Sequence, residues 1–81
     1  MQFKPQGVCA QMMNVELEGD IIKECSIVGG CNGNTQGVCA LVKGMKAQDA
    51  INRMKGIKCG FKATSCPDQL AIAIEKAMAE Q

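Results

Sequence analysis

Four of the six cysteines in this 81-residue chain stand in small-residue segments without apolar periodicity, namely Cys9, Cys31, Cys59 and Cys66. Glycine lies within two residues of the first three, and glycine lets a backbone turn tightly around a bound group. Cys66 precedes Pro67 at an expected helix start, where free N–H groups and the helix dipole stabilise a thiolate. We therefore predict that these four thiolates hold zinc or an iron–sulfur cluster, since four sulfur ligands suit both.

The alternative for each of these cysteines is an inert buried thiol, because cysteine is among the residues most often found in protein cores. Their spacing matches no compact zinc-ribbon pattern, so a shared site requires the fold to bring distant loops together. Cys25 and Cys39 fall inside an expected strand and an expected helix, and we interpret both as structural thiols. A four-thiolate zinc site would stabilise so small a domain by about 10 kcal/mol.

The composition limits the classes of binding partner and the cellular compartment that we expect for this protein. With a net charge of +1 and only two aromatic residues, the chain lacks the basic surface and stacking platform of a nucleic-acid-binding protein. No apolar run is long enough to span a membrane and the first residues lack a signal-peptide layout, so we expect a cytoplasmic protein without membrane contact. In that reducing compartment structural disulfides are the poorer interpretation. The absence of histidine excludes histidine bases, Cys–His dyads and histidine metal ligands.

The first part of the chain predicts a small antiparallel sheet. Residues 2–4 are expected as a short edge strand, because Pro5 cannot take part in a central one. Residues 13–18 alternate apolar and polar side chains, the pattern of a half-buried strand. Residues 19–20, Gly-Asp, predict a two-residue hairpin turn, after which residues 21–28 return as a second long strand. The expected core-facing side chains of this returning strand are Ile21, Cys25 and Ile27.

Two helices are expected directly after this sheet. The first is capped by Asn34 or Thr35, runs through Lys43 and ends at Gly44. The second covers residues 47 to about 54, where apolar side chains recur at helical spacing.

A third helix begins at Pro67, which suits the first helical position, with Ser65 or Cys66 as its cap and Asp68 in its first turn. Its expected buried face consists of Leu70, Ala73, Ile74, Ala77 and Met78. Strands followed by helices indicate an α+β fold, in which three C-terminal helices pack on a small antiparallel sheet made of a hairpin and an edge strand. We expect residues 1–81 to form a single domain.

The segment around Cys66 also carries a signature. Residues 64–68 read Thr-Ser-Cys-Pro-Asp, the string that names the TSCPD domain. Residues 7–9, 28–34 and 56–60 agree with the same pattern, so nearly the whole chain resembles the short, stand-alone TSCPD proteins. The resemblance implies that the family-pattern cysteines are Cys9, Cys31, Cys59 and Cys66, with Cys25 and Cys39 outside the pattern.

That resemblance implies a metal-binding domain, since members of the family are often suspected of binding metal. A related segment belongs to adenosylcobalamin-dependent ribonucleotide reductases, which implies a first alternative, an accessory or regulatory module that partners a ribonucleoside-diphosphate reductase. We do not expect the chain to be an enzyme by itself, because radical catalysis needs a nucleotide site, a large barrel and a cofactor. A second alternative is a protein-interaction module with inert cysteines and a Met- and Ile-rich surface.

A fainter likeness is to IscU- and SufU-type iron–sulfur scaffold proteins. These order their parts as a loop cysteine, a hairpin, a cysteine before a helix and a cysteine opening the last helix, and Cys9, Cys31 and Cys66 occupy those places. The likeness implies an IscU-like arrangement and a cluster-transfer partner. Cys59 supplies an additional thiol, which favours a closed four-thiolate site with zinc as the slightly preferred occupant.

Overall fold

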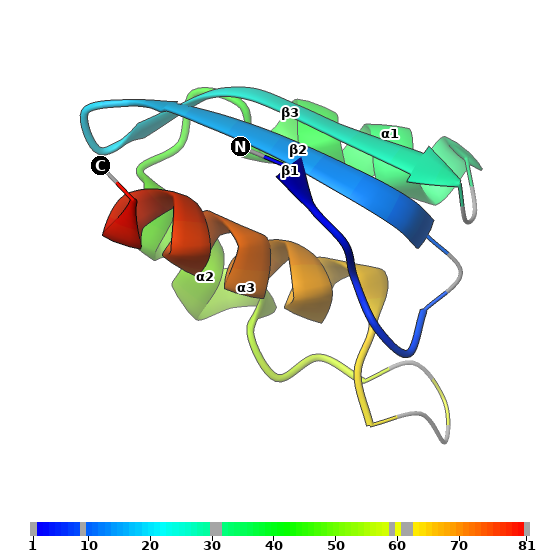
Figure 1. Ribbon diagram of the computed structural model, residues 1–81. Coiled ribbons are helices and arrows are strands. Elements are labelled where there is room, and N and C mark those ends of the chain that lie inside the picture. The colour runs from blue at the N-terminus through cyan, green and yellow to red at the C-terminus, as the bar shows by residue number, and fades with distance from the viewer. Residues whose placement is uncertain (1, 9, 30–31, 59, 61–62, 81) are drawn as a thin grey trace.

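The computed structural model describes residues 2–8, 10–29, 32–58, 60 and 63–80. A three-stranded sheet forms one layer and three helices lie against one of its faces (Figure 1). The elements in chain order are β1 (Gln2–Phe3), β2 (Ala10–Glu18), β3 (Ile21–Gly29), α1 (Asn32–Val42), α2 (Ala47–Met54) and α3 (Cys66–Ala79). The predicted α+β fold is confirmed.

The sheet has the strand order β1-β2-β3 with antiparallel pairing throughout, so that β1 is the predicted edge strand beside the hairpin. Along β2, Met13 and Val15 are fully buried whereas Glu16 and Glu18 are not, which confirms the predicted alternation. The hairpin turns at residues 19–20, where Gly19 has a φ of 62°. A glycine at that backbone angle avoids the strain that a side chain would introduce.

A β-bulge near the turn decides which side chains of β3 face the helices. The pairing of β2 with β3 shifts by one residue between Glu16 and Leu17, which inserts an extra residue into β3. Because side chains alternate along a strand, this shift turns Ile22 toward the core, where it is 1% exposed. The prediction that Ile21 faces the core is therefore wrong: Ile21 is half-buried and forms an isolated bridge with Lys46. Beyond the bulge the expected inward side chains are confirmed, namely Cys25 and Ile27.

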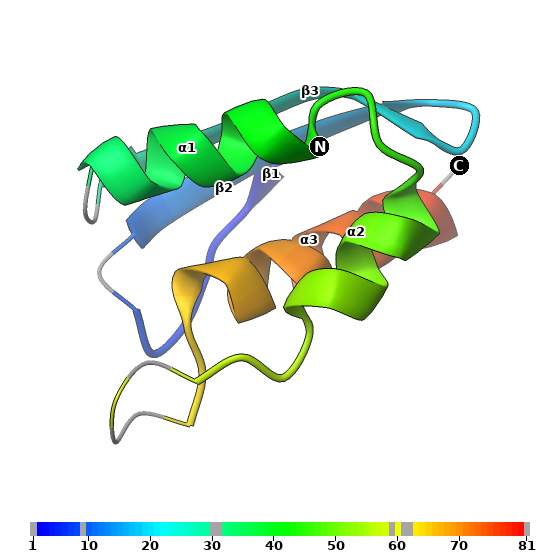
Figure 2. The same ribbon diagram turned by 180° about the vertical axis from the view of Figure 1, so that it is seen from behind.

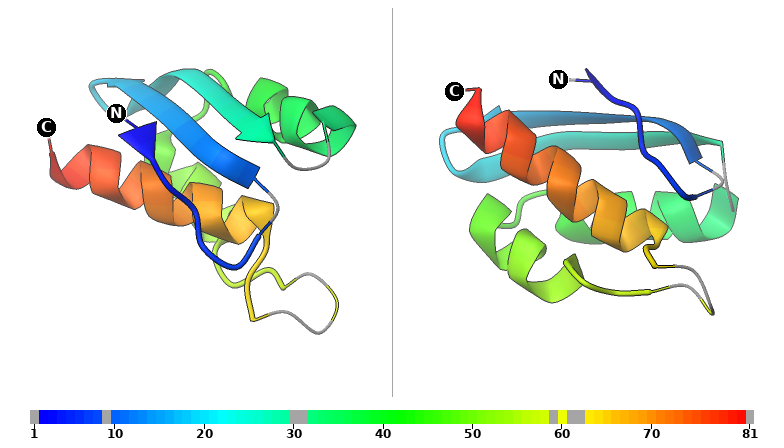
Figure 3. Two further views of the ribbon diagram at one scale, coloured as in Figure 1. Left: turned by 45° about the vertical axis from the view of Figure 1, so that its right-hand side comes forward. Right: turned by 60° about the horizontal axis from the view of Figure 1, so that its bottom comes forward.

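The core lies between the sheet and the helices. Figures 2 and 3 show α1 along β3, α3 beneath β2, and α2 beside α3 on the same side of the sheet. Met13 from the sheet and Leu70 and Ile74 from α3 are all fully buried. The predicted buried face of α3 is confirmed, with Met78 partly buried at its end. In the described part of the chain no helix combines the length and apolar character that crossing a membrane requires.

The first helix starts earlier than predicted. α1 begins at Asn32, so Asn34 and Thr35 lie inside the helix, and the prediction that one of them caps it is wrong. Glycines at positions 33 and 37 weaken the intrinsic helix propensity of this segment. However, α1 packs along β3 and Thr35 is only 3% exposed. Tertiary packing of one face stabilises such a helix more than the propensity of its residues does.

The connection between α1 and α2 is tied to the turn end of the hairpin. Gly44 ends the first helix as predicted, with a φ of 89°, and its N–H donates to the carbonyl of Ile22 at 2.8 Å. The N–H of Ile22 in turn donates to the carbonyl of Met45 at 2.9 Å, and that of Ala47 donates to the carbonyl of Asp20 at 2.7 Å. These bonds fix where α2 begins, and its predicted bounds are confirmed.

Candidate functional site

The start of α3 is built around a serine cap. Ser65 has an extended backbone, and its Oγ accepts a hydrogen bond from the N–H of Asp68 at 3.1 Å. Pro67 stands in the first turn, where its missing N–H leaves no donor unpaired. Cys66 is the first residue of the helix, and its partly buried side chain carries a free thiol. The predicted cap position, and the place of Cys66 at a helix N-terminus, are confirmed.

The polar side chains around this thiol bond to one another. The carboxylate of Asp68 accepts from the Thr64 hydroxyl and from the N–H of Gly56, the latter at 2.6 Å. These two donors, the Thr64 hydroxyl first, lower the pKa of Asp68 below its ordinary value because they stabilise the ionised form. The side-chain amide of Gln69 donates to Thr64 Oγ1 at 2.9 Å. Asp68 therefore links the first turn of α3 to Thr64, just before the helix, and to Gly56, just after α2.

Two distant parts of the chain meet this first turn. The N–H of Gln6 donates to Gln69 Oε1 at 3.1 Å, and a Cβ atom built on Gly7 would lie 3.0 Å from Thr64 Cγ2. On the other side, the Ser65 hydroxyl donates to the carbonyl of Ile57 at 2.6 Å. The segment before β2 and the segment after α2 are therefore both held against the residues just before α3.

Three of the four predicted metal ligands, Cys9, Cys31 and Cys59, lie outside the described residues. Within the ranges that the structure describes, no group of three or more histidine, cysteine, aspartate or glutamate residues could hold a metal ion. The described neighbours of these cysteines nevertheless gather. Ala10 pairs with Gly29, and Figure 3 shows the start of β2, the end of β3 and the start of α3 at one end of the molecule.

The comparison with protein families decides the identity of the chain. Residues 1–78 match the family model of the TSCPD domain. The chain belongs to the TSCPD domain family. Neither the curated proteins nor the solved structures contain a significant match to it. The match covers all but the last three of the 81 residues, so the predicted resemblance to the family along nearly the whole chain is confirmed.

The residues of the TSCPD signature differ in their roles. Thr64, Ser65 and Asp68 form the hydrogen bonds that assemble the first turn of α3, and Cys66 between them carries a free thiol. Sequence reasoning identified the cap but missed the roles of Thr64 and Gln69. The spacing of Ser65 and Asp68 is that of a capping box, and this signal could have marked the network in advance.

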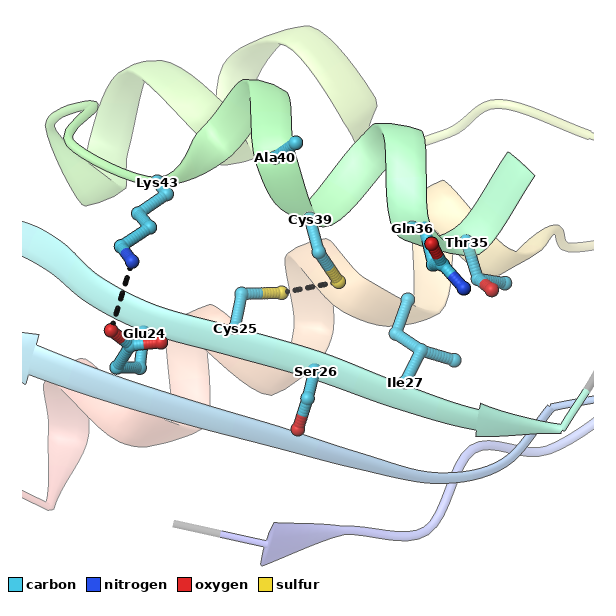
Figure 4. Close-up of a pocket in the computed structure, with 9 residues that line it drawn as sticks. All are labelled: Glu24, Cys25, Ser26, Ile27, Thr35, Gln36, Cys39, Ala40 and Lys43. Carbon is cyan, nitrogen blue, oxygen red and sulfur yellow. Dashed lines mark hydrogen bonds and ion pairs between the residues drawn. The ribbon is translucent and has the colours of Figure 1, made fainter. Parts of the chain in front are cut away.

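A pair of cysteines of the TSCPD domain lies between β3 and α1. Cys25 in β3 and Cys39 in α1 point toward one another, and their sulfur atoms are 2.9 Å apart (Figure 4). Burial raises the pKa of both thiols, and the Cys25 S–H that donates to Cys39 opposes the rise at Cys39. The predicted positions of the two residues, core-facing in a strand and inside a helix, are confirmed. Their contact was not foreseen, because sequence alone does not show which strand faces which helix.

Proposed function

We propose that this TSCPD domain is a small cysteine-ligated metal-binding domain that holds zinc or an iron–sulfur cluster. Its ligands are Cys9, Cys31, Cys59 and Cys66, and its role is accessory or scaffold-like rather than catalytic. The observation that carries the proposal is the meeting of described segments at the start of α3. Each of these segments neighbours one of the four cysteines in the chain.

The first step concerns the segments on either side of Cys66. Gly7 precedes Cys9 by two residues and approaches Thr64, while Ile57 precedes Cys59 by two residues and bonds to Ser65. Cys9 is far in sequence from Cys59 and Cys66, yet all three lie within a few residues of one junction of the fold. A glycine at position 7, with a φ of 74°, permits this approach because no side chain intervenes.

The second step concerns Cys31. Ala10, which follows Cys9, pairs with Gly29, which precedes Cys31 by two residues. The pairing of β2 with β3 thereby brings the chain neighbours of Cys31 next to those of Cys9. The convergence of chain neighbours supports a shared site for all four thiols.

The chemistry of the donors fits a soft metal centre. Cys66 carries a free thiol at the first position of α3, and four thiolates complete a closed coordination shell without water. A bound zinc would supply folding free energy, and a bound cluster would supply redox or transfer chemistry. We favour zinc, since a closed shell of four protein ligands is typical of a structural site, and we expect the domain to work in the reducing cytoplasm.

The test is metal analysis of protein purified without oxygen. We expect either a colourless protein with one equivalent of zinc or a brown protein with iron and charge-transfer absorption. Cys31→Ser and Cys66→Ser should each abolish the bound metal and lower the melting temperature, whereas the control Cys39→Ala should keep the metal. A metal-free wild-type protein, or full metal content in both serine variants, would contradict the proposal.

One observation favours the alternative of an interaction module. Among the described residues, the large apolar side chains that stand exposed are Leu41 at 77%, Val28 at 58% and Ile57 at 45%. Leu41 and Ile57 also line an apolar pocket with Pro67, between α1 and the start of α3. The methionines within the described ranges are buried or half-buried, so the expected Met-rich surface is wrong for that part of the chain. Unchanged metal content and melting temperature in both serine variants would favour this alternative.

A further inference from the structure

We propose that Cys25 and Cys39 are a redox modification site. A low-molecular-weight disulfide such as glutathione disulfide oxidises the two thiols to a reversible disulfide bond, which joins β3 to α1. The site is separate from the four cysteines of the proposed metal centre and does not depend on them. It uses the two cysteines that lie outside the TSCPD pattern.

The geometry of the pair is the first argument. Cys25 pairs across the hairpin with the fully buried Val15, so its side chain is on the helix-covered face of the sheet. Cys39 approaches from α1, and Figure 4 shows the two side chains directed at one another. The sulfur atoms are 2.9 Å apart, and a disulfide bond would bring them closer by about 0.9 Å. The fold therefore already holds the pair close to bonding distance.

Access is the second argument. The two cysteines line an open pocket at the edge of the sheet, together with Glu24, Gln36 and Lys43. Cys25 is partly exposed, and Cys39 is 9% exposed. Because both cysteines line this open pocket, a small oxidant can reach them. Because burial raises the pKa of both thiols, exchange at neutral pH should be slow.

The reaction consists of two exchange steps. The Cys39 thiolate, which accepts the Cys25 S–H and is the better stabilised of the two, attacks one sulfur of glutathione disulfide and releases one glutathione thiolate. Cys25, once deprotonated, attacks the Cys39 sulfur of the mixed disulfide and expels the second glutathione. Two electrons and two protons pass from the protein to the oxidant. The products are one protein disulfide and two glutathione thiols.

The bond would fasten α1 to the sheet. α1 contains two glycines and has neither an acidic residue in its first turn nor a basic residue in its last. An ion pair next to the helix joins Lys43, just past its last residue, to Glu24 in β3 at 3.0 Å, with both side chains more than half exposed. Closing a loop of about 15 residues across this interface should raise the melting temperature by about 10–20 °C.

Peptide mapping of the wild-type protein is the direct test. The protein is incubated with glutathione disulfide, quenched in acid, alkylated under denaturing conditions and digested with trypsin. The tryptic peptide 24–43 contains Cys25, Cys31 and Cys39. We expect this peptide to lack two hydrogen atoms, to carry one alkyl group on Cys31, and to give no backbone fragments between residues 25 and 39. Alkylation or glutathione adducts on both Cys25 and Cys39, or a bond from either to Cys31, would overturn the proposal.

Thermal unfolding of the same sample tests the consequence. The oxidised wild type should melt about 10–20 °C higher than the reduced protein, and dithiothreitol should reverse the shift. Cys25→Ser and Cys39→Ser should each remove the shift, while the control Ser26→Ala, at an exposed position of the same strand as Cys25, should retain it. A disulfide that forms between Cys25 and Cys39 without raising the melting temperature would refute the fastening of α1.

Discussion

Replacing Ser65 by alanine tests the assembly of the candidate site most directly. The substitution removes two hydrogen bonds at once, because Ser65 Oγ accepts from the N–H of Asp68 and donates to the carbonyl of Ile57. Loss of the helix cap is worth about 1 kcal/mol. Loss of the second bond is worth about another 1 kcal/mol, since Ser65 is only 4% exposed and water cannot easily replace its hydroxyl. Ser65→Ala should therefore destabilise the domain by about 2 kcal/mol.

Urea and thermal unfolding measure this loss. For a domain of this size, a loss of about 2 kcal/mol corresponds to a fall in melting temperature of about 8–16 °C. The N–H of Asp68 should also exchange with solvent faster, because its acceptor is gone. Ser26, exposed in β3, provides the control: Ser26→Ala should change stability by less than about 0.5 kcal/mol. If Ser65→Ala behaves like this control, the hydrogen bonds of the serine do not stabilise the junction between α3 and the segment after α2.

Three further substitutions probe the same end of the molecule and the first helix. Asp68→Asn should destabilise the domain by about 1 kcal/mol at pH 7. Because the pKa of Asp68 is lowered in the folded state, the carboxylate stabilises the fold fully above about pH 4, and this stabilisation is lost as the pH falls through the folded-state pKa. The free energies of unfolding of the two proteins, measured with urea, should therefore converge in acid. Gly7→Ala should lose more stability than Gly19→Ala, although both glycines have positive φ, because only the new Cβ at position 7 meets a described neighbour, Thr64; equal losses would exclude that close approach. Gly37→Ala, inside α1 and with no described atom within 4 Å of the added carbon, should raise the melting temperature by about 4–8 °C, and a decrease would show a packing role that the backbone does not reveal.

Local signals in the sequence predicted several elements correctly. The turn at Gly19, the end of α1 at Gly44 and the cap at Ser65 each depend on one residue whose backbone freedom or hydroxyl suits that place. The bounds of α2 follow from apolar spacing over two turns. In each of these cases the signal lies within a few residues of chain, so the sequence contains it, although Gly44 and Ala47 also bond to the distant hairpin in the folded protein.

Non-local pairing decided the errors. The bulge turns Ile22 rather than Ile21 toward the core. It depends on the register between two strands, and no residue in β3 predicts it. The early start of α1 depends on burial of Thr35 against the sheet, which outweighs the weak helix propensity of its glycines.

The sequence by itself determined the family of this protein, its α+β order of strands and helices, and the residue types at which a thiolate site could form. Tertiary structure alone decided which of these residues meet. Gln6 and Gln69 become partners, and the thiols of Cys25 and Cys39 come together, only because the sheet and the helices pack in one register. The reason is physical: hydrogen bonds and contacts between distant segments form when burial of the common core holds those segments side by side, and no local pattern encodes that placement.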